Sequence, residues 1–281
     1  MNEERLTLSC LDSIEAQTVK PYEVIIIDQG KQKLHWKFSE KYNFNTTRVS
    51  FSENRGFAEG NNRGIYEARG NYIFCLNNDT LLKPDCIERL VKTIERCNDT
   101  ADMYAFKLVL PGGTVGSYGI EYKKYGLAKE VKSLNRCHKI SMPCGGAAVY
   151  SRYMLDKIKT KYGYFDGRYF AYSEDVDLGL RALNNNFYCQ LVDSEIMHYQ
   201  GMTTNKFPKT CYYLSIRNRI ITYKRQPKNI YYPIFIGLQV MVYLKYLIKG
   251  IDMLPAIQDG FNERFRPIDE IAKRYDENIR G

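Results

Sequence analysis

The run Asn77-Asn78-Asp79 directly follows the apolar stretch Tyr72–Leu76. A short apolar run bounded by polar turn residues is typical of a buried strand. An aspartate at the end of such a strand can hold a divalent cation against a diphosphate, because Mg²⁺ usually takes one or two protein carboxylates together with phosphate oxygens and water. Asn and Asp also favour ordinary turns, so a turn without a metal is the open alternative.

A second group of carboxylates, Glu174, Asp175 and Asp177, follows Ser173. Serine is a favoured helix cap, so these acids are predicted to lie in the first turn of a helix. A carboxylate that faces a cleft there could take a proton from an attacking hydroxyl group. The alternative is structural, because acids stabilise a helix N-terminus by about 0.3–1 kcal/mol and Asp177 can pair with Arg181 one turn later.

Three glycines, Gly56, Gly60 and Gly64, recur every four residues and would share one face of a helix. Each costs about 1 kcal/mol relative to alanine inside a helix, so a close approach of a packed strand or of a ligand is expected at this face. The spacing does not match the glycine pattern of a dinucleotide-binding fold or of a P-loop. The chain has three histidines, too few for a histidine-rich metal site; His198 is either a structural residue or one additional ligand in a carboxylate and phosphate site.

These residues must be positioned by alternating strands and helices. Strands are predicted over Glu23–Ile27, Tyr72–Leu76, Met103–Leu110, Gly145–Tyr150 and Phe187–Val192; helices are predicted over Ala58–Arg69, Pro84–Cys97 and from Ser173 to about Asn185. Such alternation indicates an α/β fold with a mostly parallel central sheet flanked by helices. Ligands of such sheets bind beyond the carboxyl ends of the strands, which is where Asp28 and Asp79 lie.

The composition excludes several classes of protein. The chain has 281 residues, 44% of them hydrophobic, and a formal net charge of +9. This hydrophobic content excludes a disordered chain. The sequence has no repeat at a fixed period, which excludes a solenoid. The eight cysteines are scattered without a C-x-x-C pair, which predicts reduced thiols in a cytoplasmic protein.

Taken in order, these segments resemble family 2 glycosyltransferases of the GT-A fold, nearest to the rhamnosyltransferase-like branch. The matching segments are 24–28 (VIIID), 54–62 (NRGFAEGNN), 76–79 (LNND), 144–147 (CGGA), 164–170 (YFDGRYF), 173–178 (SEDVDL), His198, and Tyr213 with Arg217-Asn218. The resemblance implies a GT-A domain over residues 1–220 and a basic, partly apolar helical extension over residues 221–281.

The resemblance also implies an inverting transfer of a sugar from a nucleotide-diphosphate donor, with UDP or dTDP as the nucleotide, to a glycan or lipid-linked acceptor in surface polysaccharide synthesis. Asp175 corresponds to the catalytic base, and Asp79 and His198 correspond to ligands of a divalent cation, Mg²⁺ or Mn²⁺. The implied substrate-binding residues are Asp28 at the base, Asn54 and Asn61 at the nucleoside, Gly145 and Gly146 at the donor sugar, and Gly60, Asn78, Glu174, Asp177 and Arg217.

One part of the family pattern is absent from the start of this sequence. Family members begin with an apolar strand and a Thr-Tyr-Asn-like loop, whereas this chain begins with Asn2-Glu-Glu-Arg-Leu, which matches the following helix. We therefore expect a domain truncated at its N-terminus, either by a mis-set start or in a shortened gene copy. Loss of that strand would leave unpaired backbone groups in the sheet. A non-catalytic, membrane-associated homologue is the alternative function.

The basic charge is concentrated near the C-terminus. Nine Lys and Arg residues and no acidic residue lie between Lys206 and Lys249, around the apolar stretch Ile230–Ile248. This stretch is short for a membrane span, which needs about 17–25 apolar residues, and it contains Pro233 and Lys245. We expect a helix that lies on an anionic membrane surface, at the inner face of the cell membrane, or one packed on the catalytic domain. No nucleic-acid-reading motif accompanies the charge, so no nucleic-acid partner is expected.

Overall fold

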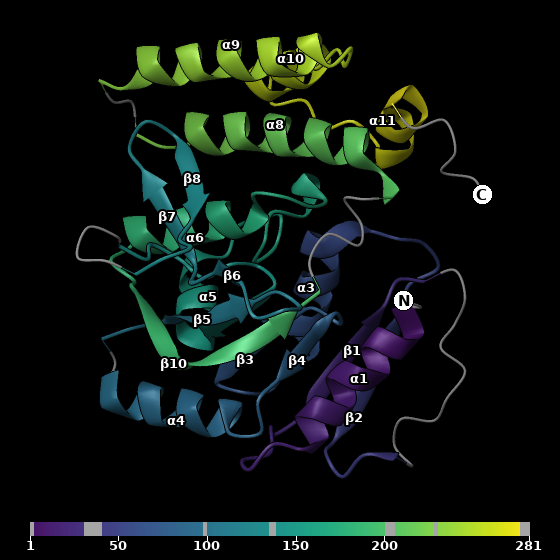
Figure 1. Cartoon of the computed structure of the whole chain (residues 1–281), viewed down its shortest axis with the longest axis vertical. Coiled ribbons are helices and arrows are strands. Elements are labelled where there is room, and N and C mark those ends of the chain that lie inside the picture. Colours follow the sequence, from purple (N-terminus) through teal and green to yellow (C-terminus); the bar gives the residue numbers. More distant parts are fainter. Residues whose placement is uncertain are drawn as a thin grey trace.

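The computed structural model describes residues 3–30, 41–97, 100–134, 139–199, 206–227 and 230–275 (Figure 1). The helices are α1 (Glu3–Glu15), α3 (Gly56–Glu67), α4 (Cys86–Cys97), α5 (Arg152–Ile158), the 3₁₀ helix η1 (Gly167–Tyr169), α6 (Glu174–Asn184), α8 (Pro208–Lys224), α9 (Tyr232–Ile248), α10 (Leu254–Phe261) and α11 (Ile268–Tyr275). The strands are β1 (Val24–Asp28), β2 (Thr46–Ser50), β3 (Tyr72–Leu76), β4 (Thr80–Leu82), β5 (Met103–Val109), β6 (Val115–Ser117), β7 (Ile120–Lys123), β8 (Leu127–Glu130), β9 (Ala147–Ser151) and β10 (Cys189–His198).

A six-stranded sheet lies at the centre, with the order β3-β9-β5-β10-β4 and with β6 paired to β5. β5 and β10 are parallel, and β1 pairs in parallel with β2 in a separate two-stranded sheet. β9 is antiparallel to β3 and to β5, and β4 and β6 are also antiparallel to their partners. The α/β class is therefore confirmed, but the predicted mostly parallel central sheet is corrected to a mixed sheet in which β5 and β10 form the parallel pair. β9 runs opposite to β3 and β5, and the described part of the connection from β5 to β9 contains β6, β7 and β8 and no helix.

Strand β9 shows how the sheet divides the interior. Ala147 and Val149 belong to the apolar cluster that includes α1 and α4, whereas Ala148 and Tyr150 belong to the cluster that includes α3, α5 and α6. Successive side chains of a strand point to opposite faces, so a strand with helices on both faces is apolar at every position. The helices thus cover both faces of the central sheet, as the sequence predicted.

The C-terminal helices α8 to α11 pack together at one end of the molecule, the upper end in Figure 1. They share an apolar cluster that includes Leu214 and Ile220 of α8, Phe235 of α9 and Ile271 of α11. α10 approaches α8 closely at Gly260, where an added Cβ would lie 2.8 Å from the Cβ of Ile220. The predicted domain boundary after residue 220 falls inside α8.

The predicted elements are found with shifts of a few residues at their ends. The helix after Ser173 begins as expected, but Ser173 adopts a left-handed conformation with φ of 64° and makes no side-chain capping bond. All described cysteines are free thiols, whereas Cys137, His35 and His138 lie outside the described residues.

Candidate functional site

Asp79 and His198 meet at one edge of the central sheet. Asp79 lies in the turn between β3 and β4, and His198 ends β10, whose last residues pair with β4. Nε2 of His198 lies 3.2 Å from Oδ1 of Asp79, and both side chains are largely buried. The contact lacks the alignment of a hydrogen bond, so among the described residues this buried Oδ1 atom has no hydrogen-bond partner.

The next feature is the glycine pair that links this edge to Asp175. Gly146 faces the ring of His198, where an added Cβ would lie 2.7 Å from Cε1. Its carbonyl accepts a hydrogen bond from the backbone N–H of Asn77 at 3.0 Å. The backbone N–H of Gly145 donates to Oδ2 of Asp175 at 3.0 Å. The structure therefore joins five predicted site residues, Asp79, His198, Gly145, Gly146 and Asp175, through one short run of contacts.

Asp175 and Glu174 differ in how their carboxylates are satisfied. Asp175 accepts hydrogen bonds from the backbone N–H groups of Gly145 and Val176. Desolvation raises the pKa of Asp175, and these backbone bonds partly offset the rise. Glu174 is buried, and its Oε2 atom has no hydrogen-bond partner among the described residues. Burial, followed by the charge of Asp175, raises the pKa of Glu174 well above its ordinary value. The raised pKa of Asp175 gives its carboxylate the higher basicity that a proton acceptor requires, whereas the pKa of Glu174 is raised far enough to favour its protonated form.

Asp177, the third acid of this segment, lies in an ion-pair network. Its carboxylate accepts from Nε of Arg181 at 2.9 Å, and Nη1 of Arg225 lies 3.5 Å away. Arg225 also pairs with the buried Asp166 at 2.9 Å. The structural alternative from the sequence, an i,i+4 pair of Asp177 with Arg181, is therefore present, and the network ties α6 to the C-terminal end of α8.

The loop before Glu174 is backbone-strained and is held by Asn218, which lies in a segment that matches the family but had no predicted role. Phe170, Tyr172 and Ser173 all have positive φ, between 64° and 70°, a conformation that costs non-glycine residues of order 1–3 kcal/mol each. The side-chain amide of Asn218, fully buried on α8, donates to the carbonyls of Tyr169, Ala171 and Tyr172 at 3.1, 2.8 and 2.7 Å. Its place in the matching pair Arg217-Asn218 was the signal in the sequence.

The predicted base-binding residue, Asp28, ends β1 and is buried. Its Oδ1 accepts from the backbone N–H of Gly30 at 3.0 Å, and its Oδ2 pairs with Arg48 at 2.5 Å. Next to it, Gln29 accepts from the backbone N–H of Arg55 and donates to the carbonyl of Gly56. Gln29 thus links the end of β1 to the start of α3, a role that no pattern in the sequence suggested.

The glycine face of α3 packs closely on protein. An added Cβ at Gly60 would lie 2.5 Å from Nε2 of Gln29, and one at Gly64 would lie 3.5 Å from Ile27. Gly56 has φ of 85° and would place a Cβ 2.5 Å from the carbonyl oxygen of Phe170. The sequence left two alternatives for this face, close packing of protein or approach of a ligand. The structure shows close packing, against β1 and the 170–173 loop.

The three predicted asparagines occupy different places. Asn54 is exposed, and its side chain accepts from the backbone N–H of Gly56 at the start of α3. Asn61 donates to the carbonyl of Phe57 within the same helix. Asn78 is exposed and donates to the hydroxyl of Thr7 on α1. The buried amide of α3 is Asn62, which pairs with the backbone N–H and carbonyl of Phe165.

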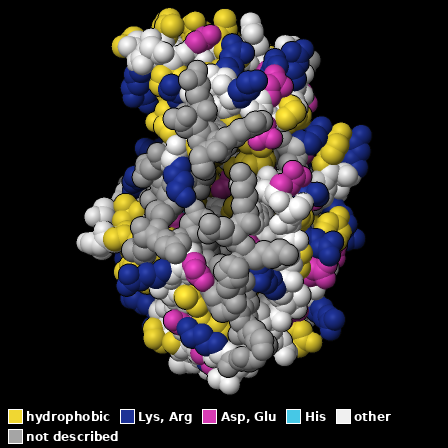
Figure 2. Space-filling view, turned by 90° about the vertical axis from the view of Figure 1, so that its right-hand side faces the viewer, with side chains coloured by type: hydrophobic (Ala, Val, Ile, Leu, Met, Phe, Trp, Pro, Cys, Tyr) yellow, Lys and Arg dark blue, Asp and Glu magenta, His cyan; other side chains and the backbone are white. Residues whose placement is uncertain are grey.

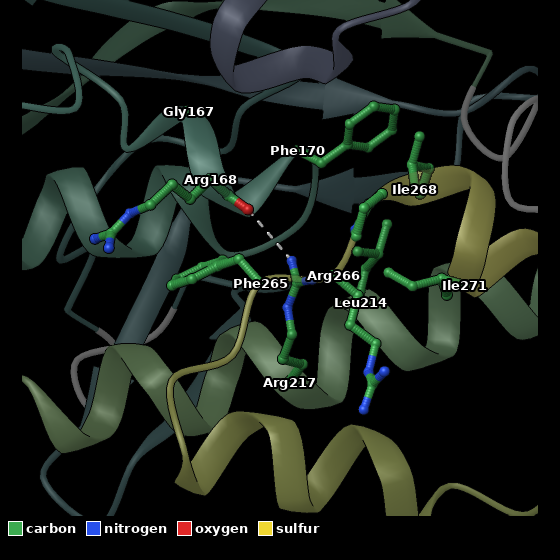
Figure 3. Close-up of a pocket in the computed structure, with 10 residues that line it drawn as sticks. Gly167, Arg168, Phe170, Leu214, Arg217, Phe265, Arg266, Ile268 and Ile271 are labelled. Atoms are coloured by element: carbon green, nitrogen blue, oxygen red, sulfur yellow. Dashed lines mark hydrogen bonds between the residues drawn. The ribbon is translucent and has the colours of Figure 1, made fainter.

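The last predicted substrate residue, Arg217, lies away from this edge, on α8. It is 1% exposed and lines a separate cavity of about 330 Å³ between η1, α8 and α11 (Figure 3).

A divalent cation would find only part of its ligand shell in the protein. No cluster of three or more His, Cys, Asp and Glu side chains with metal-binding spacing occurs in the parts of the chain that the structure describes. The Asp79–His198 pair nevertheless offers one carboxylate oxygen without a hydrogen-bond partner and one imidazole. Because a nucleotide's phosphate oxygens commonly complete the shell of such a cation, this pair fits a cation that binds together with a diphosphate.

Comparison with known proteins identifies the family of this chain. The family model for glycosyl transferase family 2 matches residues 1–159, more than half of the chain. The uncharacterized glycosyltransferase YwdF of Bacillus subtilis is 27% identical over 175 residues, which cover 61% of this chain and 61% of that protein. Matched segments span 27% and 61% of the length of the first two curated relatives.

Two solved structures resemble the fold over almost the whole chain. GalNAc-T7 with UDP, GalNAc and Mn²⁺ gives a TM-score of 0.60 at 14% identity and covers 96% of this chain and 54% of that one. TarS of S. aureus in complex with UDP gives a TM-score of 0.58 at 15% identity and covers 96% of this chain and 80% of that one. These similarities show the GT-A fold, and the match to the family model shows that the chain belongs to glycosyl transferase family 2.

Proposed function

We propose that this chain transfers a sugar, with inversion at the anomeric carbon, from a nucleotide-diphosphate donor to a glycan or lipid-linked acceptor in surface polysaccharide synthesis. The observation that carries the proposal is the run of contacts from Asp79 and His198 through the Gly145–Gly146 pair to Asp175. It connects Asp79 and His198, the pair proposed to hold the cation, to a desolvated carboxylate through two adjacent glycines. The resemblance favours a UDP- or dTDP-linked sugar and a rhamnosyltransferase-like specificity.

In this mechanism Asp175 accepts the proton of the acceptor hydroxyl as that oxygen attacks the anomeric carbon. The N–H groups of Gly145 and Val176 orient its carboxylate, and desolvation raises its pKa and thus its basicity. Asp79 and His198 would hold Mg²⁺ or Mn²⁺, which supplies positive charge against the leaving diphosphate. Gly146 keeps the space beside His198 free of a side chain. The bound UDP and Mn²⁺ of GalNAc-T7 and the bound UDP of TarS support a nucleotide and a cation here.

The test is a thermal melt of the full chain with Mn²⁺ and excess UDP, dTDP or GDP. A ligand at 100 times its Kd stabilises a protein by about 2.7 kcal/mol, which is about 5 °C for a chain of this size. We expect a shift with a pyrimidine nucleotide that requires the cation and is lost in Asp79→Asn. Asp175→Asn should keep the shift but lose sugar transfer. Asp193→Asn, whose side chain is 93% exposed, is the charge-matched control. A cooperative melt that no nucleotide shifts would contradict the proposal and favour the non-catalytic alternative.

We also propose that the protein is cytoplasmic and attaches peripherally to the anionic inner face of the cell membrane through α9. No helix among the described residues has the length and apolarity to span a membrane. Yet α9 buries only Phe235 and Gln239 and exposes a row of apolar side chains that includes Val240, Met241 and Leu244. Figure 2 shows hydrophobic side chains at this upper end of the molecule, with Lys and Arg side chains beside them. An apolar row flanked by basic charge suits an anionic lipid surface.

A further inference from the structure

The cavity of about 330 Å³ beside α8 is built from three separate segments. Its walls are mostly apolar and come from Phe170 after η1, Leu214 of α8, and Phe265, Ile268 and Ile271 around the start of α11. This volume is at the lower end of the range for small-molecule sites, about 300–1,000 Å³. The cavity is connected to the candidate active site along the chain, because Phe170, which lines it, begins the strained loop that leads to Glu174 and Asp175. The carbonyl of Phe170 accepts a hydrogen bond from the backbone N–H of Ala58 of α3.

Three arginines line this cavity, and two of them are neutralised. Arg168 makes two hydrogen bonds to the carboxylate of Asp166, at 2.9 and 2.6 Å. Arg266 pairs with Asp259 and with Glu270. In Figure 3 the guanidinium groups of Arg168 and Arg266 point away from that of Arg217.

Arg217 differs because, in the part of the chain that the structure describes, no carboxylate forms an ion pair with it; Asp259 acts on its charge only from a longer distance. Its Nε donates to the side-chain oxygen of Asn218 at 2.8 Å, and its Nη2 donates to the carbonyls of Tyr169 and, at 3.5 Å, Arg168. No carboxylate of the described residues lies within ion-pair distance of it. The nearby Asp259 forms its ion pair with Arg266 instead. Burial lowers the pKa of Arg217, but arginine stays protonated in proteins.

The surroundings compensate this charge only in part. The guanidinium lies 5.2 Å from the centre of the Phe265 ring and 5.8 Å from that of Tyr213. Leu214 and Ile268 line the same cavity. A buried cation without an anion is costly, and a guanidinium group matches the oxygens of a phosphate. The cavity therefore combines one unpaired positive charge with hydrocarbon walls.

We infer that this cavity binds the phosphate ester of a lipid, with its anionic oxygens on Arg217 and its first hydrocarbon segment against Leu214, Ile268 and Ile271. The inference rests on the proposed function and assigns the acceptor to a chemical class. A sugar linked to a lipid through phosphate carries the hydroxyl, the anion and the hydrocarbon in one molecule. Its sugar would then extend past Phe170 toward Asp175.

The experiment is calorimetric titration of the full chain, without nucleotide or cation, with geranyl phosphate at fixed salt. We expect saturable binding that neither geraniol nor inorganic phosphate reproduces. Arg217→Gln keeps amide donors and removes the charge, and it should weaken binding about tenfold or more. Arg264→Gln removes an equal charge from a side chain that is 60% exposed and outside the cavity, so it should bind as the unchanged chain does.

A second variant keeps the test decisive if Arg217→Gln fails to fold. Ile268→Trp fills the cavity from its partly exposed rim and leaves Arg217 in place, and it should also abolish binding. Equal binding of geranyl phosphate by the unchanged chain and both variants would overturn the inference. Equal binding of decanoate would overturn the assignment to phosphate. Dihexanoyl phosphatidic acid distinguishes the source: stronger binding of this probe than of geranyl phosphate would support a bilayer phospholipid as the phosphate ester rather than a prenyl-linked acceptor.

The outcome is separable from that of the proposed function. A chain whose melt responds to nucleotide and Mn²⁺ but that does not bind geranyl phosphate would refute this inference alone. Binding of geranyl phosphate through Arg217, together with no binding of any nucleotide, would refute the proposed sugar transfer. The inference of a lipid-phosphate site would then still stand.

Discussion

Glu174 and Asp175 are neighbours in the chain but stand in different surroundings. Backbone N–H groups satisfy the carboxylate of Asp175, whereas one oxygen of Glu174 is buried without a hydrogen-bond partner among the described residues. Unpaired burial disfavours the charged form. Glu174 therefore holds its proton more tightly than Asp175 does, and only Asp175 is arranged to act as a carboxylate base.

This difference predicts a stabilising substitution. The raised pKa of Glu174 means that the native state keeps a proton that the unfolded state releases, so native stability falls as pH rises from about 4.5 to the raised native pKa. Glu174→Gln removes this loss. Its gain in unfolding free energy over the unchanged chain should grow over that range and then level off, as measured by urea unfolding between about pH 4 and pH 8. Glu53→Gln, with a side chain that is 71% exposed, should show no such trend. A gain independent of pH would contradict the assignment.

A second residue-scale prediction concerns Asn218, a positioning residue for the 170–173 loop. Asn218→Asp would turn an oxygen toward carbonyls that now accept from the amide, and each carbonyl left unsatisfied costs about 1–3 kcal/mol. We expect lower stability and a kcat reduced about tenfold or more, with the KM for the donor little changed, because the loop leads into Asp175. Asn184→Asp alters an exposed amide on α6 and should change neither. Equal losses in kcat and in donor affinity would indicate a general folding defect instead.

At the scale of elements, the glycine face of α3 fixes how this helix sits on β1 and on the 170–173 loop. Gly56 lies against the backbone of Phe170, whereas Gly64 lies at ordinary contact distance from Ile27. The three glycines therefore have different tolerances for a methyl group, although their spacing in the sequence is the same.

This contrast gives a matched pair of substitutions. Gly56→Ala should lower the unfolding free energy by at least about 1 kcal/mol, because φ is positive and the Cβ would meet the Phe170 carbonyl. Gly64→Ala should raise it by up to about 1 kcal/mol through helix propensity. Denaturant unfolding of both variants checks the signs. A stabilised Gly56→Ala protein would show that the approach of Phe170 is not required.

At the scale of the whole molecule, the C-terminal helices have two faces with different environments. α8 is buried between the sheet domain and α9 to α11, and it supplies Arg217 and Asn218 to the loop before the candidate base. α9 leaves most of its apolar side chains exposed. One bundle can thus support the active site on one side and a membrane on the other.

The membrane proposal is tested by sedimentation with vesicles. The chain should bind phosphatidylglycerol vesicles more strongly than phosphatidylcholine vesicles, and less so at high salt, because basic residues contribute about 1 kcal/mol each near an anionic surface. Met241→Glu on α9 should weaken binding at least several-fold. Tyr22→Glu changes a side chain of the same exposure, 67%, far from α9 and should not. Equal sedimentation of the two variants would contradict the role of α9.

The sequence by itself determined the α/β class, the order of its main elements and the chemical types at the site. Apolar runs and their polar ends are local signals, and these signals alone place Asp28, Asp79 and Glu174–Asp177 at the ends of strands or at the start of a helix. The direction of β9 was not determined, because it depends on which neighbours the strand meets rather than on its own residues.

Only the tertiary structure decided which of these residues act together. It brought Asp79 to His198 and Gly145 to Asp175, pairs separated by 119 and 30 residues, and it set Arg217 apart in its own cavity. It also gave Asp177 and Glu174 different surroundings. Arginines pair with the carboxylate of Asp177, whereas one carboxylate oxygen of Glu174 has no hydrogen-bond partner among the described residues. The physical reason is that burial, ion pairing and shared hydrogen bonds are properties of packed neighbours, which a residue's type and its position in the chain do not contain.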